Sequence, residues 1–284
     1  MSVTLPEISD ERRVRRKRVR TALLKVSDIN PVTRQSDFDF SGRSIIPYAH
    51  DYRHGDYEDW HTHSCAQLIH TLSGVIRIET RLGLWVVPPS RGVWIPANIP
   101  HALHITGDVK ARVLFVEPLA RADLPVICQV VGVSDLLREL IICALTLPAD
   151  YLPGSRAEHV YELMLDEIRV MDMLPFHLPE PVSERLKQLC QAVRDAPHET
   201  WSIEQAAAKI NASGRTLNRH FYQQTGMQFS EWVRRARLLH ALTRLAQGEQ
   251  ITRVALDSGY ASPGAFSVMF RRVMGMTPSE YFSK

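Results

Sequence analysis

Cysteine is scarce in this sequence of 284 residues, and long apolar runs are absent. The four cysteines, Cys65, Cys128, Cys143 and Cys190, are scattered with no C-x-x-C spacing. This argues against a zinc ribbon or a disulfide framework and is typical of the reducing cytoplasm. No apolar stretch approaches the roughly 20 residues that span a bilayer, and no apolar core follows the N-terminal charges, as a signal peptide would require. We therefore expect a cytoplasmic protein without a membrane partner.

Charge is unevenly distributed, although the formal net charge is only +3. Residues 183–284 carry 14 Lys and Arg against 8 Asp and Glu, whereas residues 21–182 carry 13 against 20. A basic C-terminal third is a reason to expect nucleic acid as its partner, although a solvated basic face would look the same. The run RRVRRKRVR at residues 12–20 predicts a disordered basic arm.

Two kinds of periodicity divide the chain. Between residues 44 and 117, apolar residues recur at every second position and Gly, Pro and Asn interrupt them, which predicts a small β-barrel or β-sandwich. Residues 134–147 and 156–174 have the spacing of amphipathic helices, and everything after residue 183 is predicted to be helical. The fold class is therefore α+β with two domains. The predicted segments are an arm at 1–43, a barrel at 44–125, a helical dimerisation or linker region at 126–182, and an all-helical domain at 183–284.

The helical domain contains one helix–turn–helix unit at residues 201–226. Ser202 and Gln205 have the spacing of a capping box, and Ser213 is placed to cap the next helix. In that second helix Leu217 and Phe221 are four residues apart and face inward. The residues predicted to face outward are Arg215, Thr216, Asn218 and Arg219.

A second unit follows at residues 251–275. Ser262 and Pro263 form a cap followed by proline at the first helical position, and Phe266 and Phe270 repeat the inward pair. The outward residues here are Gly264, Ala265, Ser267 and Val268. Residues 228–248 are predicted to form one long helix between the units, a rigid spacer suited to two major-groove segments about 34 Å apart.

These features together resemble the DNA-binding domain of the AraC/XylS family of transcriptional regulators. The resemblance covers residues 183–284 and is carried by Ala206, Ser213, Leu217, Phe221, Gly226, Arg237, Leu238, Ala255, Gly259, Tyr260, Phe266, Phe270, Arg271, Gly275 and Pro278. It implies that Arg215, Asn218 and Arg219 read bases and that Thr216 contacts phosphate. Arg271 and Arg272 are further phosphate candidates.

The second reading helix departs from the family pattern because its outward positions are small or apolar. Val268 offers only an apolar contact, for example to a thymine methyl group. We therefore expect the first reading helix to dominate base specificity and the second to contribute mainly backbone contacts.

The stretch WHTHSCAQLIH at residues 60–70 belongs to a second resemblance. Gly55, His61, His63, Gln67 and Gly74 have the spacing of the first cupin motif, and Pro96, Asn98 and His101 that of the second. The resemblance implies a cupin-like effector domain, which AraC-family regulators commonly carry. Three imidazoles and one oxygen donor suit a divalent transition metal. However, metal-binding cupins usually have Glu where Gln67 stands, so an organic effector that hydrogen-bonds to the histidines is an open alternative.

The main hypothesis is a transcriptional regulator, not an enzyme, that senses a small molecule or a metal and binds double-stranded DNA. RNA polymerase is a further candidate partner, and apolar faces in residues 134–147 and 156–174 favour a homodimer. One alternative is a metal-dependent cupin enzyme with an accessory DNA-binding domain. Another is a constitutive DNA binder whose barrel is purely structural.

Overall fold

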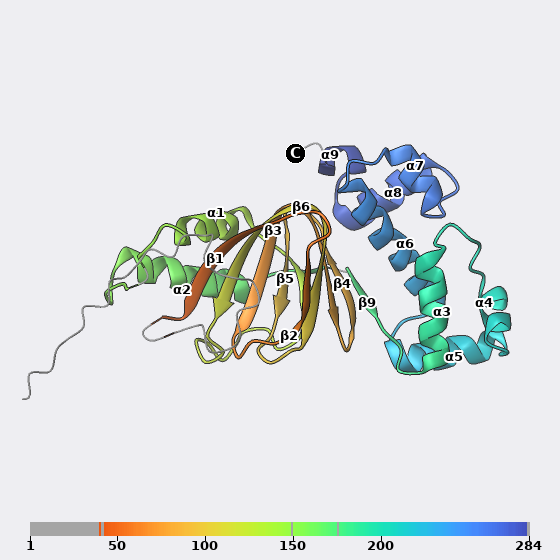
Figure 1. Cartoon of the computed structure of the whole chain (residues 1–284), viewed down its shortest axis with the longest axis horizontal. Helices are drawn as coiled ribbons and strands as arrows, with labels where there is room; N and C mark the ends of the chain where they lie inside the picture. Colours follow the sequence, from red (N-terminus) through yellow and green to blue (C-terminus); the bar gives the residue numbers. More distant parts are fainter. Residues whose placement is uncertain (1–39, 41–42, 149, 175, 283–284) are drawn as a thin grey trace, which may run out of the picture. The chain divides into compact units, whose positions relative to one another are not determined.

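The computed structural model describes residues 40, 43–148, 150–174 and 176–282. The predicted basic arm at residues 12–20 lies outside these residues. The described part of the chain forms a strand-rich sheet domain that continues into helices (Figure 1). The strands are β1 (Ile45–Tyr52), β2 (Tyr57–His61), β3 (Ala66–Thr80), β4 (Gly83–Val87), β5 (Arg91–Ile95), β6 (His101–Val116), β7 (Gln129–Gly132), β8 (Met173–Leu174) and β9 (His177–Pro179).

Two long strands organise the sheet. β3 and β6 pair with each other antiparallel along most of their length, and the register shifts between Thr71 and Val75. On one side of this irregularity β1 and β5 flank the pair, and on the other side β2 and β4 flank it. Extra residues at such a shift bend and twist a strand. The sheet therefore has two halves, one on each side of the shift, and its two longest strands run through both.

The two faces of the sheet have separate cores. Leu68, Trp94 and Leu114 are buried on one face, where helices α1 (Asp135–Ala144) and α2 (Arg156–Arg169) cover them. The alternate residues of the same strands, such as Ile69 and Phe115, are buried on the other face. The period of two seen in the sequence therefore follows from the two-sided burial of this sheet.

The helical part consists of α3 (Glu184–Asp195), α4 (Ile203–Lys209), α5 (Gly214–Thr225), α6 (Phe229–Leu245), α7 (Ile251–Asp257), α8 (Pro263–Met274) and α9 (Pro278–Phe282). The predicted capping box of Ser202 and Gln205 is present at the start of α4. Ser213 and Ser262 cap α5 and α8 through their side-chain oxygens. Gly259 follows α7 with a φ of +81°, and a Cβ there would lie 2.5 Å from the carbonyl oxygen of Pro197. Only glycine fits this turn without strain.

Residues 126–182 are more mixed than the predicted helical region. They contain α1 and α2, but β7, β8 and β9 also lie in this segment and pair with the sheet. These strands have only two to four residues, too few for a periodic pattern to be visible. Within the described ranges, no helix has the length and apolarity needed to cross a membrane.

Candidate functional site

Three histidines meet in the interior of the sheet domain. His61 ends β2 and lies opposite His101, the first residue of β6, in the antiparallel pairing of these strands. The rings of His61 and His101 are 4.3 Å apart, and the His63 ring lies 5.0 Å and 5.7 Å from them. One nitrogen from each ring lies within 4.8 Å of the other two. The structure thus brings together three of the four residues predicted to bind an effector or metal.

The alternation of side chains along a strand does not explain the position of His63. β2 ends at His61, so His63 lies beyond the strand. Its carbonyl oxygen accepts a hydrogen bond of 2.7 Å from the backbone N–H of Asn98. Asn98 has a φ of +62°, a left-handed conformation that asparagine tolerates better than most residues. Asn98, a residue of the second motif, therefore holds a turn conformation that glycine adopts most readily.

Backbone carbonyls orient two of the three rings. His61 Nδ1 donates to the carbonyl oxygen of Asp59 at 2.6 Å, and His101 Nδ1 donates to that of Ile99 at 2.8 Å. A carbonyl oxygen only accepts, so a proton is assigned to Nδ1 in both rings, and the Nε2 atom of a neutral His101 ring presents its lone pair. His101 Nε2 is buried and has no hydrogen-bond donor among the described residues. Metal-binding histidines commonly show this pattern.

Burial keeps two of the rings neutral. It lowers the pKa of His63 to about 4 and that of His101 to about 3, and positive charge on His61 acts in the same direction. The charged imidazolium is disfavoured because the site is poorly solvated. At neutral pH both rings are therefore in the form that binds a metal ion.

Gln67 faces the same interior as the residues two positions before and after it. It lies in β3 between Cys65 and Ile69, which both belong to that core, and only 7% of its surface is exposed. Its Oε1 atom is buried and accepts no hydrogen bond from any residue described. Gln67 therefore places a neutral oxygen in the interior.

Glu58 is an acidic residue of this site that the motifs did not indicate. It is 7% exposed, and its Oε1 accepts a hydrogen bond of 2.5 Å from the hydroxyl of Tyr52. Its Oε2 lies 3.7 Å from His61 Nε2. Burial raises the pKa of the Glu58 carboxyl, although Tyr52 and His61 oppose the shift. Residues 58 and 61 would face opposite sides of a regular strand, so the sequence pattern did not reveal this neighbour.

Aromatic and polar rings of β1 lie beside this cluster. The Tyr48 hydroxyl and His50 Nδ1 are hydrogen-bonded at 3.1 Å, and the rings of His50 and Tyr52 are 4.2 Å apart. Tyr48 also lies beside Phe115, whose ring contacts His63. This wall combines apolar faces with hydrogen-bonding groups, which suits an organic ligand as well as a metal.

The predicted reading residues of α5 differ in their surroundings. Arg215 and Arg219 are exposed. Asn218 is half-buried, and its Oδ1 accepts a hydrogen bond of 3.4 Å from the backbone N–H of Phe229, the first residue of α6. Its side chain thus contacts the start of the spacer helix, a role that the sequence did not suggest. Tyr222, 58% exposed and one turn further along, was missed by the motif and extends this face of α5.

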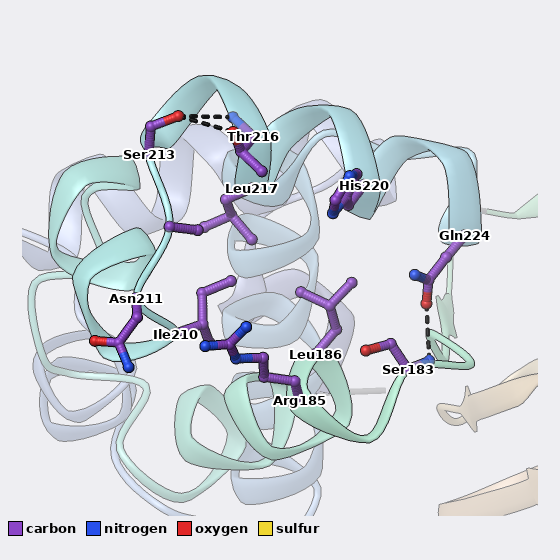
Figure 2. A pocket seen from close by; sticks show the side chains of 11 residues that line it. Ser183, Arg185, Leu186, Ile210, Asn211, Ser213, Thr216, Leu217, His220 and Gln224 are labelled. Carbon is purple, nitrogen blue, oxygen red and sulfur yellow. Dashed lines mark hydrogen bonds between the residues drawn. The ribbon is translucent and has the colours of Figure 1, made fainter.

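A cavity of about 510 Å³ borders another side of α5 (Figure 2). Thr216, His220 and Gln224 line it at four-residue intervals from α5, and Arg185 lines it from α3. The Thr216 hydroxyl is 2.9 Å from that of Ser213. The residue predicted to contact phosphate therefore lies beside the helix cap, on a different side of α5 from Arg215 and Arg219.

The residues of α8 that are predicted to face DNA are small or apolar. Gly264 and Ala265 are exposed, Ser267 is half-buried, and Val268 is 74% exposed. Arg271 and Arg272 in the last turn are exposed as well. The arginines therefore provide the positive charge of this helix, away from its N-terminal half.

The chain is similar to two protein families and to several known proteins. Residues 44–210 match the AraC-like ligand binding domain family, and residues 206–284 match a helix-turn-helix domain family. The chain is 30% identical over 224 residues to the HTH-type transcriptional regulator NimR of Escherichia coli, covering 79% of this chain and 82% of NimR. It is 34% identical over 103 residues to the regulator RipA of Corynebacterium glutamicum, covering 36% of this chain and 31% of RipA. A solved structure of ToxT from Vibrio cholerae, 13% identical, covers 85% of this chain and 98% of its own, with a TM-score of 0.36.

Proposed function

The chain belongs to the AraC family of transcriptional regulators, and we propose that its sheet domain controls operator binding by sensing a divalent transition metal held by His61, His63 and His101. It is a DNA-binding regulator with a ligand-binding effector domain, and its relatives are regulators, not enzymes. The single observation that carries the proposal is the convergence of three ring nitrogens within 4.8 Å in this domain.

The donor set fits such an ion. Imidazole suits zinc, copper, iron and nickel, and two of the three rings are already oriented by backbone acceptors. The buried Nε2 of His101 has no donor among the residues described. A buried acceptor without a partner costs about 1–3 kcal/mol, so a cation would relieve an unfavourable feature. When bound, the ion would stabilise the arrangement of β2 and β6.

An organic effector is the second candidate. The wall formed by Tyr48, His50, Tyr52 and Phe115 supports it, because these rings provide stacking faces and hydroxyl groups. A thermal-shift comparison distinguishes the candidates, because a ligand that binds only the folded state raises the melting temperature. Zinc or nickel should raise it in wild type, and His101→Ala should abolish that rise. A rise with small molecules alone would favour the organic effector, and no rise with either would favour a constitutive DNA binder.

We propose that α5 provides most of the base specificity and that α8 provides mainly backbone contacts. Arg219 has the chemistry to contact guanine in the major groove, whereas Val268 offers only an apolar surface. In a gel-shift titration with a selected operator, Arg219→Ala should weaken specific binding by about 1–3 kcal/mol. Val268→Ala should have a smaller effect. A larger loss of discrimination from Val268→Ala would contradict this assignment.

Removal of the metal tests the link between the two domains. Operator affinity should change when the protein is treated with a chelator and should recover when zinc or nickel is restored. The His101→Ala variant should be insensitive to both treatments. If wild type and variant respond alike, the histidine cluster does not control DNA binding.

The remaining partners follow from surfaces and composition. Exposed apolar residues on α1 and α2, including Leu136, Ile142 and Leu163, support a homodimer that binds paired sites. RNA polymerase is a candidate partner of the DNA-bound form. The scattered cysteines support a cytoplasmic location. Sedimentation of the purified protein would test the dimer directly.

A further inference from the structure

We propose that the cavity between α3 and α5 in the helical part is a second ligand site, which binds a small organic anion. Such an anion carries a carboxylate or phosphate group on an apolar body. The inference goes beyond the proposed function and does not depend on the histidine cluster of the sheet domain. Neither the motifs nor the relatives described above assign a ligand to this part of the chain.

The cavity has the size and the mixed lining of a small-molecule site. Its volume is about 510 Å³, within the range of roughly 300–1,000 Å³ that is usual for such sites. Leu186, Ile210 and Leu217 line it with apolar side chains that are nearly fully buried. Polar side chains from α3, from α5 and from the turn before α5 complete the lining (Figure 2). An occupant can therefore combine apolar contacts with a few hydrogen bonds.

Arg185 brings a positive charge to this cavity. It lies in the first turn of α3 and lines the cavity from that side, beside Ile210 (Figure 2). Within the described part of the chain, its guanidinium group has no hydrogen bond or ion pair. None of the described residues that line the cavity is acidic. The charge of Arg185 is therefore not compensated by a carboxylate of the cavity wall.

Two further side chains contribute donors, because their acceptor atoms are already occupied. Gln224 Oε1 accepts a hydrogen bond of 2.8 Å from the backbone N–H of Ser183, which leaves the NH2 group of the Gln224 amide as a donor. His220 Nε2 lies 3.3 Å from a guanidinium nitrogen of Arg219. A guanidinium group only donates, so Nε2 is the acceptor and the ring proton is assigned to Nδ1. Together with Arg185, these residues offer N–H donors from two helices.

These donors favour an anionic ligand. Carboxylate and phosphate oxygens accept several N–H hydrogen bonds, and such bonds to arginine are about twice as strong as those between neutral groups. A cation would be repelled by Arg185. The buried apolar side chains favour an organic anion over inorganic phosphate. They also favour it over a DNA phosphate, because the sugar–phosphate strand brings no apolar group to Leu186 and Leu217.

The test follows the backbone amide shifts of the isotope-labelled full chain by NMR during titration with sodium benzoate at constant sodium concentration. Benzoate should shift the amides of residues 211–217, whereas benzamide, which has the same ring without the charge, should not. Arg185→Gln should weaken benzoate binding roughly tenfold, the loss expected for one charge-assisted hydrogen bond. Lys187→Gln is the matched control and should bind benzoate as wild type does, because it removes the same charge from the same helix at a residue outside the cavity.

Gel-shift titrations with a selected operator, in the absence of benzoate, distinguish a ligand site from a DNA contact. If the cavity binds a free anion, Arg185→Gln and wild type should bind the operator equally well. A uniform loss of DNA affinity in Arg185→Gln, with a smaller salt dependence, would assign the cavity to a DNA phosphate and overturn the inference. The absence of benzoate shifts at residues 211–217, or equal benzoate affinity of Arg185→Gln and wild type, would overturn it as well. None of these outcomes affects the proposed metal site, whose ligands lie in the sheet domain.

Discussion

Acidification should destabilise the sheet domain through His101 and His63. Burial lowers their pKa values from 6.5 to about 3 and about 4, respectively. Below pH 6.5 the unfolded chain therefore takes up protons that the folded chain does not. Since stability rises with pH wherever the unfolded state binds more protons, stability is greatest above pH 6.5 and falls as the pH drops toward the folded values.

The size of the effect follows from these values. One pKa unit corresponds to about 1.4 kcal/mol. A pH of 5.5 is one unit below the unfolded pKa and more than one unit above both folded values. Each histidine should therefore lower the free energy of unfolding by about 1.4 kcal/mol at pH 5.5 relative to pH 7.5. The two histidines together should lower the free energy of unfolding by about 3 kcal/mol. This is a large share of the stability of an ordinary domain.

The assay is urea unfolding with tryptophan fluorescence at pH 7.5 and 5.5, in the presence of a chelator. His101→Asn keeps a donor for the Ile99 carbonyl but does not titrate, so its loss between the two pH values should be about 1.4 kcal/mol smaller than that of wild type. Val113→Ala is the control, because it removes buried apolar atoms and should lower stability equally at both pH values. If wild type and His101→Asn lose the same free energy on acidification, burial does not keep this ring neutral and the reasoning is wrong.

Two further predictions concern the helix cap and the motif position. Ser262→Ala removes the side-chain acceptor of the Ala265 N–H at the start of α8 and should lower stability by about 1 kcal/mol, measured by thermal unfolding. Ser267→Ala, on the same helix but away from the cap, should have little effect, and equal losses would contradict the cap assignment. Gln67→Glu should strengthen zinc binding, because it places a carboxylate at the motif position where metal-binding cupins usually have one. No gain in a competition with a chromogenic chelator would show that position 67 does not reach the metal.

The helical part was predictable because short-range rules determine it. Ser202, Ser213 and Ser262 cap the helices that their sequence context indicated, and each such rule depends on residues within one turn. The contact of Asn218 with the start of α6 was not predictable, because it depends on how two helices pack. The assignment of base-reading residues stays a prediction for the same reason: exposure is observed, but contact with a base is not.

The type of the sheet domain and the convergence of His61, His63 and His101 were predictable. The spacing of the two motifs is typical of a fold that brings these residues together, although they are distant in the sequence. Glu58 was not predictable, because its place depends on one extra residue in β2 relative to β6. A shift of one residue reverses the side that every later residue faces. Sequence periodicity does not detect such a shift when the side chains around it are polar.

The position of Glu58 changes the charge expected around the histidines. From the motif alone, Gln67 makes the donor set neutral and weakens the argument for a metal. In the folded chain a buried carboxylate lies 3.7 Å from one of the histidines, held there by Tyr52 from another strand. The charge around a motif therefore also depends on residues outside it, because a bulge can bring a neighbouring residue of the strand to the same side.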